Sequence, residues 1–153
     1  MLLSLFLLFP LGSLAQEDLN AGLVSGIWYS KLPFFAGETV RIYTAIQNNS
    51  GTDVKGKIQF LKNEEMLEET PFSAVKGGLI QVWTDWKAQE GTYKISAKIV
   101  ESIPPISSSF AVAQHEVFVD KDTDKDQVGN TQDTDDDNDG LTDGKEAILG
   151  TNP

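Results

Sequence analysis

A run of aspartates near the C-terminus carries the clearest chemical pattern in the chain. Asp135, Asp137 and Asp139 stand at alternate positions, a glycine follows directly, and Glu146 ends a stretch of twelve residues. The stretch fits the spacing D-x-[DN]-x-[DN]-G-x5-E at every defined position. Carboxylates at alternate positions of a curling loop converge on one point, the glycine permits the sharp turn, and the last glutamate closes the shell with both oxygens. The spacing predicts a calcium loop, here called loop 2 (residues 135–146).

Six residues of loop 2 are expected to supply its oxygen ligands. The side chains at positions 1, 3, 5 and 12 bind directly, position 7 offers its backbone carbonyl, and position 9 binds directly or through a water. In chain order these residues are Asp135, Asp137, Asp139, Leu141, Asp143 and Glu146. The alternative is a disordered acidic tail. Such a tail does not require acids at these particular positions, so we favour calcium binding.

A second copy, called loop 1 (residues 122–133), begins thirteen residues earlier. Its expected ligands are Asp122, Asp124, Asp126, the backbone carbonyl of Val128, Asn130 and Asp133. The copy departs from the pattern at position 6, where Gln127 replaces the glycine, and at position 12, where an aspartate replaces the glutamate. The shorter side chain of Asp133 is expected to reach towards loop 2 instead of binding with both oxygens. We therefore expect loop 1 to be the weaker site.

One residue separates the two loops, which leaves no room for the helices that paired EF-hands and dockerin modules need. Loops placed end to end with little regular structure resemble the thrombospondin type 3 repeat, in its Cys-free bacterial form. The resemblance covers residues 120–153 and rests on the acids from Asp122 to Asp143, on Glu146 and on the ending Gly150-Thr151-Asn152-Pro153. It implies a backbone wrapped around a file of calcium ions. Residues 145–149 are expected to form one helical turn, because a glycine and a proline follow them.

The charge of the chain is concentrated in the same segment. The formal net charge is −11, of which residues 120–153 contribute −8 and residues 1–119 only −3. So acidic a chain is expected to repel nucleic acid and anionic lipid headgroups, because both are bound by clustered cations. The chain has no cysteine and one histidine, which excludes disulfides, thiolate metal sites and histidine-clustered metal sites.

Residues 20–119 alternate apolar and polar side chains between turn signals, and this predicts strands. We expect seven of them, over residues 23–29, 39–47, 54–61, 66–70, 79–86, 92–100 and 110–119. Seven short strands in about 100 residues favour an all-β fold, a β-sandwich of immunoglobulin or fibronectin III type. Trp86 and Tyr93 are expected in its core, and Tyr93 stands after a glycine turn, where a tyrosine corner is expected.

Several turn and core residues of this region are shared with a known group of domains. The segments Phe35–Val40 with Gln47-Asn48, Trp86–Ala88 and Gly91–Ile95 resemble the immunoglobulin-like, adhesion-related domains of bacterial surface proteins, the CARDB-like group. The resemblance covers roughly residues 22–101. It implies a fold and an exported habitat, and it implies no chemistry.

The first residues have the composition of a targeting segment. Residues 2–11 are leucine and phenylalanine apart from Ser4 and Pro10. A helix needs roughly 20 apolar residues to cross about 30 Å of hydrocarbon, so this run is too short to span a membrane. Small residues at Ser13 and Ala15 suit cleavage before Gln16, which predicts a signal peptide over residues 1–15. An uncleaved membrane anchor is the alternative; we expect no membrane span in the mature chain.

No sequence pattern of an enzyme is present: G-x-S-x-G, a P-loop and a dinucleotide fingerprint are all missing, and His115-Glu116 lacks the second histidine of a zinc protease. We expect a non-enzymatic, calcium-binding, secreted or cell-surface structural or adhesion protein. The sandwich would be a spacer or adhesion module with a protein or glycan partner, and the acidic repeats a calcium-stiffened connector. The alternative is a carbohydrate-binding or accessory module of a larger secreted enzyme. For the outward-facing Trp83, packing against the next segment is favoured over stacking on a sugar ring.

Overall fold

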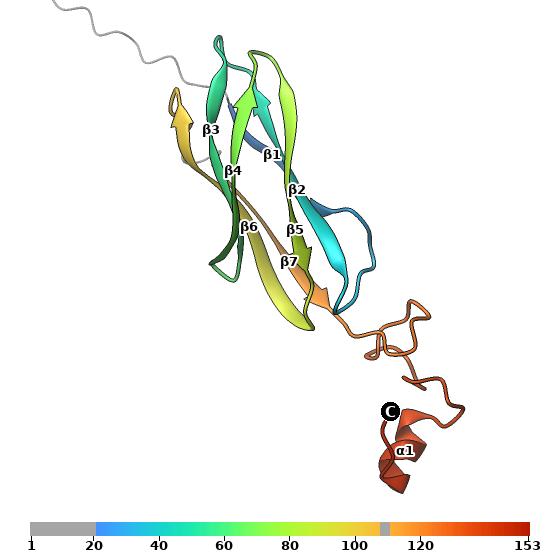
Figure 1. The fold of residues 1–153 in the computed structure, drawn as a ribbon. Coiled ribbons are helices and arrows are strands. Elements are labelled where there is room, and N and C mark those ends of the chain that lie inside the picture. The colour runs from blue at the N-terminus through green and yellow to red at the C-terminus, as the bar shows by residue number, and fades with distance from the viewer. Residues whose placement is uncertain (1–20, 108–110) are drawn as a thin grey trace, which may run out of the picture.

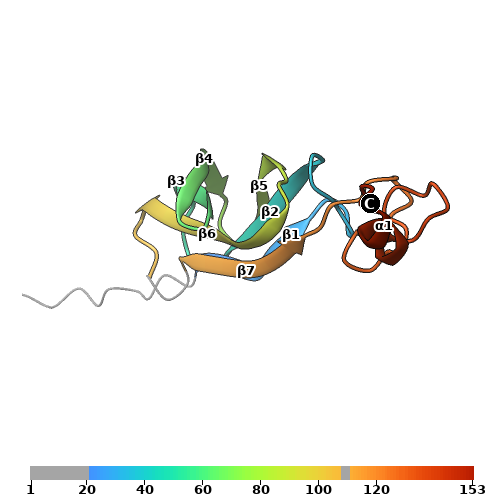
Figure 2. The ribbon, with the colours of Figure 1, turned by 90° about the horizontal axis from the view of Figure 1, so that it is seen from below.

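The computed structural model of the chain describes residues 21–107 and 111–153. The predicted signal peptide, residues 1–15, lies outside the described residues. Two β-sheets face each other, and residues 120–153 continue from one end of this sandwich as an irregular tail (Figures 1 and 2). The part of the chain that the structure describes contains no helix with the length and apolar character needed to cross a membrane.

Every strand pairing between the named strands is antiparallel. The smaller sheet has the order β1-β2-β5, with strands β1 (Ala21–Tyr29), β2 (Thr39–Asn48) and β5 (Leu79–Lys87). The larger sheet has the order β4-β3-β6-β7, with strands β3 (Val54–Lys62), β4 (Glu65–Ala74), β6 (Gly91–Ile103) and β7 (Val112–Val119). The tail ends in one short helix, α1 (Asp143–Leu149).

The all-β class and the immunoglobulin-like sandwich are confirmed. The described residues contain the seven strands named above, and several of their ends differ from the expected ranges. Strand β4 runs on through Pro71 to Ala74, whereas the expected strand covers only residues 66–70. Because β4 is an edge strand that pairs with β3 alone, the missing N–H of this proline is tolerated.

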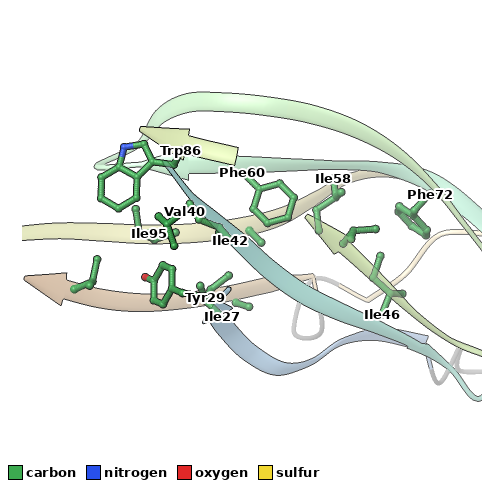
Figure 3. Packing of buried hydrophobic residues seen from close by; sticks show 14 of the residues in the cluster. Ile27, Tyr29, Val40, Ile42, Ile46, Ile58, Phe60, Phe72, Trp86 and Ile95 are labelled. Carbon is green, nitrogen blue, oxygen red and sulfur yellow. The ribbon is translucent and has the colours of Figure 1, made fainter. Parts of the chain in front are cut away.

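The core lies between the sheets and follows the alternation of the sequence. Val40, Ile42 and Ile46 of β2 are fully buried, and they meet the inward residues Ile58 and Phe60 of β3 (Figure 3). Apolar residues at every second position of a strand share one face, so this pattern places a continuous apolar layer between the sheets.

Trp86 and Tyr93 occupy the end of the core that is nearest to the tail. Trp86 is 4% exposed and meets the edge of the Tyr93 ring, with ring centres 5.3 Å apart. Tyr93 is half-buried, and its hydroxyl donates a hydrogen bond to the backbone oxygen of Glu90 at 3.0 Å. This is the predicted tyrosine corner, which fixes the turn that leads into β6.

Replacing Trp86 with alanine should lower the free energy of unfolding by about 3–5 kcal/mol, because it leaves a large cavity in a packed core. The matched control is Leu79→Ala in the same strand, since Leu79 is 59% exposed and should contribute less than about 0.5 kcal/mol. Urea unfolding followed by circular dichroism measures both values. Equal unfolding midpoints for the two variants would contradict the assigned facing of β5.

Candidate metal centre

Loops 1 and 2 each gather three carboxylates. One oxygen from each of Asp135, Asp137 and Asp139 lies within 4.8 Å of the other two. The same holds in loop 1, where the converging oxygens belong to the residues at positions 1, 3 and 5, namely Asp122, Asp124 and Asp126. The structure therefore brings together the three alternating acids that the sequence predicted in each loop.

Hydrogen bonds from the backbone to these same side chains shape loop 2. Asp139 N donates to Asp137 Oδ1 at 3.1 Å, and Gly140 N donates to Asp135 Oδ2 at 3.2 Å. Leu141 N donates to Asp139 Oδ1 at 2.8 Å. Short polar side chains that accept bonds from amides two to five residues ahead compete with helix and strand and favour tight loops. The acids thus fold the loop that collects them.

Loop 1 repeats this set of bonds position by position. The amides at positions 5, 6 and 7 donate to the carboxylates at positions 3, 1 and 5, as in loop 2. The pairs are Asp126 N to Asp124 Oδ1 at 3.0 Å, Gln127 N to Asp122 Oδ2 at 3.1 Å, and Val128 N to Asp126 Oδ1 at 2.7 Å. The two loops have one architecture despite the two departures in the sequence of loop 1.

Positions 4 and 6 of both loops adopt a left-handed backbone. The φ angles are 58° at Asn138 and 95° at Gly140 in loop 2, and 71° at Lys125 and 77° at Gln127 in loop 1. A residue with a Cβ pays roughly 1–2 kcal/mol for this conformation, whereas glycine adopts it freely. Gln127 therefore leaves the shape of loop 1 intact but strains its backbone.

The residues at position 9 close the loops. Asp143 Oδ1 accepts a hydrogen bond from Asp136 N at 2.9 Å, so position 9 is tied to position 2. In loop 1, Asn130 Oδ1 accepts bonds from the amide and the hydroxyl of Thr123, both at 3.1 Å. Neither residue belongs to the three-acid clusters among the described residues. Their structural task was missed by the sequence analysis; their ligand role stays a prediction.

Asp133, the last residue of loop 1, is hydrogen-bonded to the start of loop 2. Its Oδ1 accepts hydrogen bonds from Thr134 N at 2.7 Å and from Asp135 N at 3.1 Å. This is the direction expected for a side chain too short to close its own loop, and it joins the end of loop 1 to the first residue of loop 2.

Glu146 has one carboxylate oxygen that is buried without a partner. The residue is 1% exposed, and its Oε2 is buried without a hydrogen bond. Burial raises the pKa of Glu146; a hydrogen bond with Thr151 opposes this, while the charges of Asp137 and Asp139 raise the pKa further. A buried carboxylate among other acids is costly unless a cation pairs with it. Asp135 Oδ1 is also buried and unpartnered, so the donors of loop 2 fit a cation.

Asp136 is a structural link between the loops that the motif could not reveal, because position 2 of the calcium loop is undefined. Its Oδ2 accepts a hydrogen bond from Asn130 Nδ2 at 2.8 Å, which links the two loops. Its Oδ1 is buried without a partner. Burial raises the pKa of Asp136, and the neighbouring charges of Asp143 and Asp133 raise it further. The one available signal was the run of three consecutive aspartates.

Trp83, the candidate for stacking on a sugar, is anchored on the outward face of β5. The Arg41 guanidinium lies 3.7 Å from the centre of the Trp83 ring. Arg41 is itself held by Asp85 through bonds of 2.8 and 3.1 Å. The guanidinium covers one face of the indole, and the residue keeps 45% of its surface exposed. A glycan partner stays a prediction.

Relieving the strain at position 6 should strengthen loop 1. We expect Gln127→Gly to tighten calcium binding there by about two- to five-fold, because the gain from removing a left-handed glutamine exceeds the entropy cost of a glycine. The reciprocal change, Gly140→Gln, should weaken loop 2 by a similar factor. Calorimetric titration with calcium measures both.

Gln132→Gly is the matched control, since Gln132 is exposed and its φ is not left-handed. It should not tighten binding. An unchanged or weaker loop 1 in Gln127→Gly would show that the backbone at position 6 does not limit this site.

Known proteins resemble the two parts of the chain separately. The family model described as Bacterial TSP3 repeat matches residues 135–153, which contain loop 2 and α1. Loop 1 lies outside that match. Among curated proteins, none matches the sequence.

Solved structures resemble the sandwich. The CARDB domain of a Pyrococcus furiosus protein, crystallised in complex with di-metal ions, aligns with a TM-score of 0.56 and 19% identity over 74% of this chain and 99% of that one. Its solution NMR structure gives 0.50 and 19% over 67% and 94%. A β-glucosidase from Listeria innocua gives 0.46 and 19% over 65% of this chain and 16% of that enzyme. The chain therefore joins a CARDB-like immunoglobulin fold to a segment that matches the bacterial TSP3 repeat.

Proposed function

We propose that loops 1 and 2 bind calcium ions and that these ions are the core around which the tail folds. One observation carries the proposal. In residues 120–153, all of which the structure describes, the single buried residue is Glu146. A segment whose only enclosed side chain is a carboxylate has no apolar core to stabilise it. A cation bound at this carboxylate would take the place of that core.

Calcium suits the donors of loop 2 better than other common cations. The candidate ligands are oxygens alone: the side chains of Asp135, Asp137, Asp139, Asp143 and Glu146, and the carbonyl of Leu141. Calcium accepts six to eight such oxygens in a flexible shell, whereas magnesium demands a small octahedron and keeps its waters. Zinc prefers cysteine and histidine, and the only histidine, His115, lies in β7.

Ion binding and folding of the tail are expected to be one event. The eleven acids of residues 120–153 repel one another, and the segment offers few apolar residues, of which Val128, Ile148 and Leu149 are exposed. Binding energy at a site that does not exist in the unfolded chain becomes folding energy. Extracellular calcium modules commonly bind at about 10⁻⁴–10⁻³ M, and the five candidate ligand carboxylates of loop 2 favour the tighter end.

For the whole chain we propose a non-enzymatic, secreted or cell-surface structural or adhesion module. The predicted signal peptide supports export, and extracellular fluid supplies calcium at the concentration that such loops need. The sandwich would serve as a spacer or as an adhesion module with a protein or glycan partner. The calcium-loaded tail would be a stiff connector, because it extends from the end of the sandwich as a chain of closed loops (Figure 1).

Removing a ligand from loop 2 should abolish the tighter site. We expect Asp139→Ala and Glu146→Ala each to eliminate the high-affinity heat in a calorimetric titration with calcium, because each removes a charged member of a shared shell. Glu116→Ala removes an exposed acid from β7 and should bind calcium as the unchanged chain does. Full binding by Glu146→Ala would contradict its place in the shell.

Calcium should also order the backbone of the tail. We expect amides from residue 122 to 146 to gain protection from hydrogen exchange when calcium is added and to lose it in a chelator, because the ions supply the missing stabilisation. Magnesium at the same concentration should protect poorly. No heat and no gain of protection with calcium would overturn the proposed function.

A further inference from the structure

The junction between the β-sandwich and loop 1 is held by Asp120, the residue directly after β7. Ala36 N donates a hydrogen bond to Asp120 O at 2.8 Å, and Phe35 forms a parallel bridge with Asp120. Phe34 precedes this bridge, is buried, and meets Trp86 edge-on, with ring centres 6.0 Å apart. Asp120 is thus connected to the core of the sandwich through three consecutive residues.

The side chain of Asp120 also binds the residue just before loop 1 and a residue near its end. Its Oδ1 accepts a hydrogen bond from Lys121 N at 2.9 Å, and its Oδ2 accepts bonds from Thr131 N at 3.1 Å and from the Thr131 hydroxyl. Beside it, Asn130 N donates to Lys121 O at 2.8 Å. Hydrogen bonds to a charged acceptor are stronger than those between neutral groups. Loop 1 therefore closes on Asp120.

Gly129 allows this close approach. A Cβ at this position would lie 2.7 Å from Cγ and 2.8 Å from Cβ of Asp120, which is closer than real Cβ atoms come. The backbone of Gly129 is not left-handed, so an alanine would suit the local conformation. Glycine is required here because the side chain of Asp120 leaves no room for a Cβ. The φ angle of Gly129 imposes no such requirement.

Loop 2 has no comparable attachment to the sandwich. Among the described residues, its hydrogen bonds to the preceding part of the chain include Asn130 Nδ2 to Asp136 Oδ2 and Asn138 Nδ2 to Asp124 Oδ2, both at 2.8 Å, and none reaches residues 21–107. The two loops therefore differ in what their closure affects: loop 1 closes on the sandwich, and loop 2 closes on loop 1.

We propose that Asp120 is a positioning residue for loop 1 and that calcium bound in loop 1 stabilises the β-sandwich through it. The inference rests on the proposed function, since it needs calcium in this loop. An ion that binds the closed loop alone shifts the equilibrium towards that form. In the closed loop, Thr131 stays hydrogen-bonded to Asp120, and Asp120 stays hydrogen-bonded to Ala36. Loop 1 then unfolds together with the sandwich, and the cooperative unit extends beyond residue 119.

The chain offers a clean readout. Its three tryptophans, Trp28, Trp83 and Trp86, all lie in the sandwich, and residues 120–153 contain no aromatic residue. Thermal unfolding followed by tryptophan fluorescence therefore reports on the sandwich alone. We expect calcium in excess over a chelator to raise the melting temperature of the unchanged chain by about 5–10 °C.

Gly129→Ala and Asp120→Asn should each remove most of this calcium-dependent rise. The first displaces the carboxylate of Asp120, and the second replaces one of its acceptor oxygens with a donor. Gly144→Ala is the matched control, because a Cβ there meets nothing within 4 Å; it should keep the full rise. A merely structural role for Asp120 would lower the melting temperature equally with and without calcium, so the difference between the two conditions is the decisive quantity.

Calorimetry on the same samples separates the possible failures. If calcium binds to both loops of the unchanged chain but leaves its melting temperature unaltered, the coupling is wrong and the proposed function stands. If both variants keep the full rise, Asp120 does not carry the coupling, and the inference is overturned. If the unchanged chain binds no calcium, the proposed function and this inference fall together.

Discussion

Eleven carboxylates within 34 residues repel one another, and holding them close together is costly unless a positive charge lies among them. The proposed ion sites of the tail follow from this constraint. Its three lysines do not compensate the charge, and two acid clusters are nevertheless gathered within 4.8 Å by bonds from their own backbone. Glu146 adds a further buried carboxylate, and one of its oxygens has no hydrogen-bond partner. We propose that the tail is a set of cation cages, so that its stability depends on the ions.

The sandwich is stabilised in a different way, because it buries an apolar layer between its two sheets. The two halves nevertheless share a boundary at Asp120, whose backbone pairs with the sandwich and whose side chain receives the end of loop 1. This arrangement gives the two acid loops unequal surroundings. Loop 1 can transmit the effect of an ion to the sandwich, while loop 2 acts at the far end through Asn130 and Asn138.

Much of this could be predicted from the sequence, because two periodicities are strong. Alternation over residues 39–47 predicted a strand, and the structure buries Val40, Ile42 and Ile46 on one face of it. The spacing of the acids predicted the grouping at positions 1, 3 and 5 that the structure shows. What the sequence could not reveal depends on tertiary contacts. The extension of β4 through Pro71 depends on the position of this strand at the edge of a sheet. Asp136 occupies an undefined motif position, and the task of Asp120 depends on a loop eleven residues away.

The most direct test of the central claim is a crystal structure of the chain grown with calcium. The account predicts electron density for an ion in loop 2 at about 2.3–2.6 Å from oxygens of Asp135, Asp137, Asp139 and Glu146, the distances at which calcium binds oxygen. It predicts a corresponding ion among the acids of loop 1. Carboxylates that turn outwards to solvent, or clusters that hold only water in saturating calcium, would contradict it.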